Sequence, residues 1–268
     1  MSRPSRLLLL GNPTSHSLSP RIQNAALRAA GIALEYTAMD VEPSQLKSRL
    51  RALRAEGAAG NITIPFKETA FGICDHVTNI AERAGAVNTF WVQDGDLIGD
   101  NTDVAGFDFA ARELLESMRA ELPARVTLFG AGGAAAAVAS AIRDWDHTEL
   151  VIWNRDFARA EALAQRFALA RAEPNLLEAV KGANLVINAT PVGMFDDGLP
   201  VPIAALPKHC AILDLVYRKG ETPWVRGARD AGHPASDGLP MLVEQAARSF
   251  RRWLGVEPNR EVMWGALA

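Results

Sequence analysis

The chain has 268 residues, of which 49% are hydrophobic and 22% are charged, and its formal net charge is −3. This apolar content excludes a mainly disordered chain, and the charge balance excludes a globally basic nucleic-acid binder. No apolar run approaches the roughly 20 residues of a membrane span, and Leu7–Leu10 is too short for a signal peptide. The only cysteines are Cys74 and Cys210, so we expect reduced thiols, no disulfide framework and a cytoplasmic protein.

Short apolar runs alternate with helical patterns over the first hundred residues. Ser19 is expected to cap the first helix, with Pro20 at its first position, and a second helix is expected to end at Gly57. Asp94-Gly95 lies between two apolar runs and predicts a β-hairpin. Three further strands are expected at residues 6–10, 34–39 and 59–64.

The second half of the chain repeats this alternation after a long helix expected over residues 104–119. Strands that alternate with helices predict α/β domains built on parallel sheets, with a domain boundary between residues 103 and 123. The elements expected beyond it are strands at 125–129, 150–153, 185–188 and 211–215, and helices at 134–143, 158–167 and 241–253.

A glycine-rich segment follows the strand expected at 125–129 and has the G-x-G-x-x-A form. Gly130 permits a tight turn, Gly132 lets a pyrophosphate approach the backbone, and Ala135 allows close packing of helix on strand. The helix that follows offers free N–H groups and the positive end of its dipole. The motif therefore predicts a dinucleotide site, and the alternative is a glycine-rich turn that binds no ligand.

The end of the next strand selects between the two nicotinamide dinucleotides. NAD-binding versions place an acidic residue there, whereas a guanidinium grips the 2′-phosphate of NADP. Arg155 stands at this position and Arg159 follows, which favours NADP. Asp156 would repel that phosphate or serve the ribose of NAD, and Arg159 alternatively pairs with Asp156 across one helical turn.

Two polar segments carry candidate chemistry. Lys67 follows a strand end beside Pro65 and Phe66, surroundings in which a lysine serves as general acid or base. Asp103 closes a polar cluster at a helix start and is placed to pair with Lys67 or to orient a hydroxyl. Two plainer interpretations stay open: Lys67 is an exposed lysine at a helix start, and Thr102 or Asp103 caps the following helix.

A third polar segment lies at the first helix. Ser17 and Ser19 are placed to bind a carboxylate with the help of the helix dipole, although capping alone also explains Ser19. We interpret His16 as structural. The sequence shows no spaced cluster of His, Cys and acidic residues, so no metal is expected, and it shows no Ser/His/Asp arrangement.

Taken together and in this order, the motifs resemble the shikimate dehydrogenase family over almost the whole chain. The motifs that carry the resemblance are His16-Ser-Leu-Ser-Pro20, Asn61-Ile-Thr-Ile-Pro-Phe-Lys67, Gly85-Ala-Val-Asn-Thr89, Asp100-Asn-Thr-Asp103, Gly130-Ala-Gly-Gly-Ala134, Asn154-Arg155, Asn188-Ala-Thr190, Gly193-Met194, Asp214-Leu-Val-Tyr217 and Met241-Leu-Val-Glu-Gln245.

The resemblance implies reversible, NADP-linked reduction of 3-dehydroshikimate to shikimate, a step of aromatic amino acid biosynthesis. It implies that Lys67 and Asp103 are the catalytic pair and that Ser17 and Ser19 bind the substrate carboxylate. The other substrate contacts that it implies are Thr63, Asn88, Asp103, Tyr217 and Gln245. The cofactor contacts that it implies are Gly130, Ala131, Gly132, Gly133, Ala134, Asn154, Arg155, Arg159, Leu215 and Gly238.

The resemblance also implies the domain organisation. A substrate domain is expected over residues 1–103 and 239–268 and a Rossmann-like NADP-binding domain over 104–238, with a cleft between them. Such an enzyme takes a small-molecule substrate, needs neither nucleic acid nor membrane, and is expected to be a monomer or a homodimer.

The sequence departs from the family pattern at three places. Gln23 replaces a histidine, Lys219 stands where the family has a proline, and Asp156 replaces a threonine. The last departure bears on the cofactor and leaves NAD as a possible alternative to NADP. Two other functions therefore stay open, a quinate/shikimate dehydrogenase with NAD or dual cofactor use and a dinucleotide-binding regulator without turnover.

Overall fold

The computed structural model describes residues 3–268, and within them the chain folds into two compact α/β units. The first unit runs to Gly106 and resumes at Leu242, and the second spans Phe107–Met241. These limits lie three residues from the boundaries expected at 103/104 and 238/239. Each change of unit falls inside a helix, α5 (Asp103–Ser117) or α10 (Leu239–Leu254). Residues 1 and 2 of the expected substrate domain lie outside the described part.

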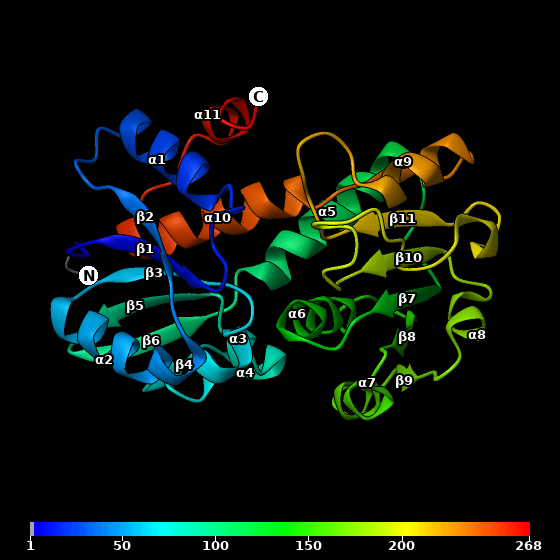
Figure 1. Cartoon of the computed structure of the whole chain (residues 1–268), viewed down its shortest axis with the longest axis horizontal. Helices are drawn as coiled ribbons and strands as arrows, with labels where there is room; N and C mark the ends of the chain where they lie inside the picture. The colour runs from blue at the N-terminus through cyan, green and yellow to red at the C-terminus, as the bar shows by residue number, and fades with distance from the viewer. Residues whose placement is uncertain (1–2) are drawn as a thin grey trace. The chain divides into compact units, whose positions relative to one another are not determined.

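The first unit contains a six-stranded mixed sheet within the described residues, in the order β2-β1-β3-β5-β6-β4 (Figure 1). β5 is antiparallel to both β3 and β6. The β5–β6 pair forms because the hairpin at Asp94-Gly95 reverses the chain, as predicted. Asp94 and Gly95 both have positive φ, as such a tight turn requires. The strands are β1 (Leu7–Gly11), β2 (Tyr36–Asp40), β3 (Ala59–Ile62), β4 (His76–Val77), β5 (Thr89–Gln93) and β6 (Asp96–Asp100).

Both faces of this sheet are covered, which explains why Leu7–Leu10 is apolar without alternation. Leu8 and Leu10 pack against Leu46 and Leu50 of α2. The carboxyl ends of β1 and β3 lie together, because Leu10 pairs with Ile62 in a parallel register. The helices of this unit, besides parts of α5 and α10, are α1 (Ser19–Ala29), the 3-10 turn η1 (Pro43–Gln45), α2 (Leu46–Glu56), α3 (Lys67–Phe71), α4 (Asn79–Ala84) and α11 (Arg260–Gly265).

The second unit contains a parallel six-stranded sheet within the described residues, in the order β12-β11-β10-β7-β8-β9 (Figure 1). Its strands are β7 (Arg125–Phe129), β8 (Glu149–Trp153), β9 (Ala170–Ala172), β10 (Leu185–Asn188), β11 (Ala211–Asp214) and β12 (Ala235–Ser236). Its helices are α6 (Gly133–Ile142), α7 (Phe157–Ala164), α8 (Leu176–Val180), the 3-10 turn η2 (Ile203–Ala205) and α9 (Pro223–Asp230). The predicted fold class, two α/β domains with sheets of parallel type, is confirmed.

Candidate active site

Lys67 and Asp103 form a nearly buried ion pair in the first unit. Lys67 Nζ lies 2.6 Å from Asp103 Oδ2, and the two side chains are only 13% and 5% exposed. Lys67 does begin a helix, α3, but it is not the plain exposed lysine that the alternative interpretation described. A buried pair of this kind persists only when neighbouring groups hold both charges in place.

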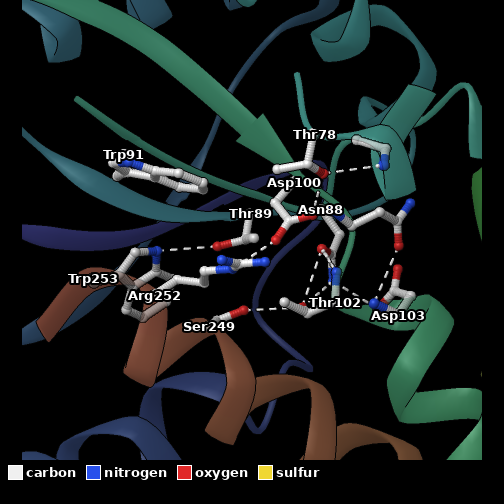
Figure 2. Close-up of polar contacts among 12 residues, drawn as sticks. Thr78, Asn88, Thr89, Trp91, Asp100, Thr102, Asp103, Ser249, Arg252 and Trp253 are labelled. Carbon is white, nitrogen blue, oxygen red and sulfur yellow. Dashed lines mark hydrogen bonds and ion pairs between the residues drawn. The ribbon is translucent and has the colours of Figure 1, made fainter. Parts of the chain in front are cut away.

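The second oxygen of Asp103 is also occupied. Asn88 Nδ2 donates to Asp103 Oδ1 over 2.8 Å and lies 3.4 Å from Gln245 Oε1 (the carboxylate and amide face each other in Figure 2). The carboxylate of Asp103 therefore binds two side chains that are distant in sequence, Lys67 and Asn88, which argues against helix capping as its role. The Thr102 hydroxyl likewise contacts Asn88 and Ser249.

The β5–β6 hairpin explains why residues far apart in sequence meet here. Thr89 pairs with Asp100, so the residues just before β5 and just after β6 emerge at one edge of the sheet. Ile62 N donates to Asn88 O, which brings the end of β3 to the same edge. Thr63 follows β3 there and is half-buried. The sheet thus gathers Thr63, Asn88 and Asp103 at the carboxyl ends of its parallel strands, where α/β proteins bind ligands.

The serine segment leaves the same edge from β1. Asp40 accepts hydrogen bonds from Thr14 N at 2.7 Å and from Thr14 Oγ1 at 2.6 Å, and these bonds hold the pKa of the Asp40 carboxyl below its ordinary value. Ser19 was expected to be the helix cap, and this prediction is wrong: Leu18 is the N-cap residue and Ser19 is the first helical residue. The Ser17 hydroxyl accepts the bond from Ser19 N instead, because it stands two residues before that donor.

The second unit carries the glycine-rich turn. Gly130 has φ +112°, and a Cβ there would lie 3.0 Å from the Ala189 carbonyl oxygen, so this turn requires glycine. α6 begins at Gly133, and its N-cap residue Gly132 has no side chain to satisfy the first N–H groups. Those donors and the half-exposed backbone over 131–134 suit the pyrophosphate of a dinucleotide.

The residues that follow β8 lie close to this turn. Arg159 Nη2 donates to the Ala131 carbonyl oxygen at 3.3 Å, which puts an exposed guanidinium beside the glycine-rich segment. Asp156 caps α7 and accepts a bond from Ala158 N, and Asn154 Nδ2 donates to the Asp156 carbonyl oxygen. Arg155 is exposed between them. The residues present therefore fit a phosphate-bearing cofactor.

Leu215, Tyr217 and Gly238 follow β11 and β12 in the second unit. A Cβ on Gly238 would lie 2.2 Å from the Leu215 carbonyl oxygen, so the close approach of these two segments requires glycine at position 238. Tyr217 is half-buried in the connection between β11 and α9. It belongs to a different unit from the other expected substrate contacts, since Gln245 and the residues near Lys67 lie in the first unit.

Two buried polar groups received no role from the sequence: Asp214, which lies in a motif of the resemblance, and Ser249, which the sequence analysis did not single out. Asp214 ends β11 fully buried, and burial raises the pKa of its carboxyl to about 6 although three donors bind it. Ser249 is also fully buried and contacts Thr102. Its position four residues after Gln245, and thus on the same helical face, is the signal that would have found it.

Metal-binding clusters and membrane-spanning helices are both absent from residues 3–268. In this range no group of three or more His, Cys, Asp or Glu side chains is arranged to hold a metal ion. None of the helices described here is long and apolar enough to cross a membrane.

Three family models match the chain: the shikimate dehydrogenase substrate binding domain over residues 9–90, shikimate / quinate 5-dehydrogenase over 111–193, and the shikimate 5'-dehydrogenase C-terminal domain over 238–268. The shikimate dehydrogenase (NADP(+)) of Thermus thermophilus is 41% identical over 255 residues, which cover 95% of this chain and 94% of that protein. The chain belongs to the shikimate dehydrogenase family.

Solved structures of the family have the same fold. A shikimate 5-dehydrogenase of Thermus thermophilus, solved in complex with NADP(H) and shikimate, is 40% identical with a TM-score of 0.86, and the match covers 97% of each chain. The quinate dehydrogenase of Corynebacterium glutamicum, in complex with NAD, is 32% identical with a TM-score of 0.86, covering 98% of this chain and 99% of that one. The suspected family is thus confirmed across both units.

Proposed function

We propose that this chain is an NADP-dependent shikimate dehydrogenase, which reversibly reduces 3-dehydroshikimate to shikimate. The observation that carries the proposal is the buried Lys67–Asp103 pair, 2.6 Å apart, whose lysine lies within the match to the family's substrate-binding domain model. The relative solved with NADP(H) and shikimate supports the same substrate and cofactor. Neither a quinate-specific enzyme nor a non-catalytic regulator is favoured, because the relatives at about 40% identity are named shikimate dehydrogenase (NADP(+)).

Lys67 handles the proton of the reaction. NADP, when bound, would accept the hydride from ring carbon C3 in the oxidation of shikimate. In the reductive direction the Lys67 ammonium donates a proton to the oxygen on C3. In the oxidation Lys67 first releases its proton and then takes the hydroxyl proton as the neutral amine, which is general acid–base catalysis. Asp103 fixes the position of Lys67 Nζ through the 2.6 Å contact, and Asn88 fixes Asp103 in turn.

The remaining polar residues orient the substrate ring. The hydroxyls of Ser17 and Ser19 hold its carboxylate at the N-terminus of α1, where the helix dipole favours a negative charge. Thr63, Asn88 and Gln245 bind its hydroxyl groups together with Asp103. Holding the ring in one geometry supplies much of the rate enhancement, because the reacting atoms no longer have to be brought together.

The second unit holds the cofactor. The backbone of residues 130–134 binds the pyrophosphate, while Asn154, Arg155 and Arg159 bind the adenosine ribose and its 2′-phosphate. Leu215 and Gly238 line the nicotinamide side. A shikimate 5-dehydrogenase of Listeria monocytogenes was solved with shikimate and NAD, so the choice of cofactor is a matter for direct measurement.

The direct test follows the absorbance of reduced nicotinamide with shikimate or quinate as substrate and NADP or NAD as acceptor. We expect rapid reduction with shikimate and NADP and far slower reduction in the other three combinations. Comparable rates with quinate and NAD would replace the proposal by a broader dehydrogenase. No turnover in any combination would contradict the enzymatic assignment itself.

The proposal includes a cytoplasmic location. It is supported by the two cysteines, which are both free thiols in the structure.

A further inference from the structure

A continuous chain of buried hydrogen bonds reaches the catalytic pair from β2. Tyr36 Oη donates to Asn61 Oδ1 at 2.8 Å, and Asn61 Nδ2 donates to Ser249 Oγ at 2.9 Å. Ser249 Oγ lies 3.0 Å from Thr102 Oγ1 (Figure 2), which lies 3.1 Å from Asn88 Oδ1. All five residues are at most 5% exposed. The chain ends where Asn88 Nδ2 donates to the Asp103 carboxylate.

The two side-chain amides in this chain have fixed orientations. Asn61 has its amide orientation fixed at both ends, because its oxygen accepts from Tyr36 and its nitrogen also donates to the backbone oxygen of Asn88 at 3.1 Å. Ser249 therefore accepts from Asn61, and its hydroxyl also shares a hydrogen bond with Thr102 Oγ1. Thr102 fixes the amide of Asn88, because Asn88 Oδ1 accepts from Thr102 N at 2.7 Å and Asn88 Nδ2 donates to Thr102 Oγ1 at 2.9 Å.

We propose that Ser249 is a positioning residue of the active site, which acts through Thr102 to keep the N–H groups of Asn88 directed at Asp103. This inference rests on the proposed function, because Asp103 and Asn88 serve the same reaction. An Asn88 amide turned over would set its oxygen against the Asp103 carboxylate, and in a buried site such a contact is strongly repulsive. Ser249 opposes this by anchoring the hydroxyl of Thr102, whose backbone N–H donates to Asn88 Oδ1.

The position of Ser249 in the fold suits this role. It lies on α10, four residues after Gln245, so one helix presents both a substrate contact and the anchor of the loop that ends in Asp103. Arg252 of the same helix binds Asp100 at 2.8 Å and holds the start of that loop. α10 therefore fixes the segment 100–103 at two points, and of these two the Ser249 contact continues through Thr102 and Asn88 to the catalytic carboxylate.

The test compares Ser249→Ala with Thr127→Val as a matched control. Thr127 is a fully buried hydroxyl of the second unit that donates to the Ala179 carbonyl oxygen at 2.6 Å. Both variants therefore remove a buried hydroxyl, with the loss of this bond in Thr127→Val and of the bonds to Asn61 and Thr102 in Ser249→Ala. We expect Ser249→Ala to lower kcat about tenfold with the KM for NADP unchanged, because a misdirected group near the reacting atoms slows chemistry without touching the cofactor. Thr127→Val is expected to keep kcat within about twofold at a similar loss of Tm.

A second measurement does not depend on turnover. The side-chain amide of Asn88 gives a pair of nuclear magnetic resonance signals, which can be assigned by their absence in Asn88→Ser. We expect Ser249→Ala to shift or broaden this pair and Thr127→Val to leave it unchanged. Tyr36→Phe interrupts the same chain two bonds earlier and is expected to move the same signals.

The outcomes separate this inference from the proposed function. A wild-type chain that does not oxidise shikimate overturns the proposed function, and the amide signals then decide whether Ser249 orients Asn88. If the wild-type chain oxidises shikimate and Ser249→Ala keeps kcat within twofold, the inference is overturned. It is also overturned if the kcat of the variant falls only in proportion to its loss of Tm. Unchanged Asn88 signals in Ser249→Ala overturn it as well.

Discussion

The carboxylate of Asp103 divides its two oxygens between two donors, Lys67 on one and Asn88 on the other. This division means that neither neighbour can move without disturbing the other. A carboxylate that is 5% exposed also has little water to replace a lost partner. The position of Lys67, the residue that we propose transfers the proton, is therefore set by Asp103 and, through it, by Asn88.

Replacement of Asp103 tests this dependence. Asp103→Asn keeps the size of the side chain but removes the charge that holds Lys67, so kcat is expected to fall about 100-fold or more. Asp96→Asn removes an exposed carboxylate that pairs with Arg54 and serves as the control, for which wild-type kcat is expected. Steady-state kinetics with shikimate and NADP checks both variants, and equal kcat values for the two would contradict the role of Asp103.

Asp214 makes the stability of the second unit depend on pH. Burial raises the pKa of its carboxyl from 3.8 to about 6, so between these values the folded chain holds a proton that the unfolded chain has released. Asp214 therefore makes its full contribution to the free energy of unfolding below pH 3.8. This contribution, on the order of 2–3 kcal/mol, is lost as the pH rises to about 6.

Asp214→Asn removes this titration and keeps an oxygen acceptor for Asn188. The difference in Tm between the wild type and the variant is expected to shift in favour of the variant as the pH rises from about 4 to about 7. Thermal unfolding of both proteins across that range measures it. A difference that stays constant with pH would show that folding does not change the pKa of Asp214.

At the scale of whole elements, helix α7 begins after Asp156, a residue that bears on both the stability of the helix and the choice of cofactor. Asp156 caps this helix by accepting from Ala158 N, so its negative charge beside Arg155 has a structural purpose. Serine caps a helix about as well as aspartate and carries no charge. The position therefore allows the cap and the charge to be separated by a single substitution.

We expect Asp156→Ser to lower the KM for NADP several-fold, because a phosphate next to Arg155 no longer meets a carboxylate. The KM for NAD is expected to stay the same or to rise, and Tm is expected to change little because the cap is kept. The matched variant Asp156→Ala loses the cap and about 1 kcal/mol of stability. If Asp156→Ser leaves the ratio of the two KM values unchanged, Asp156 plays no part in cofactor selection.

The elements that the sequence predicts are those with a strong local signal. β7 and β10 have the predicted bounds, and the turn at Asp94-Gly95 predicts the antiparallel pair β5–β6. The short strands β4 and β12 were not predicted, since two residues carry no periodicity and form a strand only because a neighbouring strand pairs with them. The strand expected to reach residue 64 ends at Ile62, because the chain turns away from the sheet before Pro65.

At the scale of the whole molecule, the sequence identifies the motif residues of the site but not the buried residues that hold them in place. Lys67, Asn88 and Asp103 lie in motifs that the sequence identifies, and the fold of the first unit brings them into contact. The hydrogen bond between Asn61 and Ser249 joins residues 188 positions apart, and a single sequence gives no signal for such a contact. The site was therefore predictable in its residue types but not in the network that orients them.

Lys67 is assigned the proton transfer in the oxidation of shikimate with NADP, and the kinetics of Lys67→Met test this role most directly. Methionine keeps an unbranched side chain of similar length without an amine. We predict that kcat falls about 100-fold or more while the KM for shikimate changes only a few-fold, because the amine acts in the transition state. The exposed residue Lys47 provides the control, Lys47→Met, with unchanged kinetics. A Lys67→Met variant that turns over shikimate at the wild-type rate would contradict the assignment.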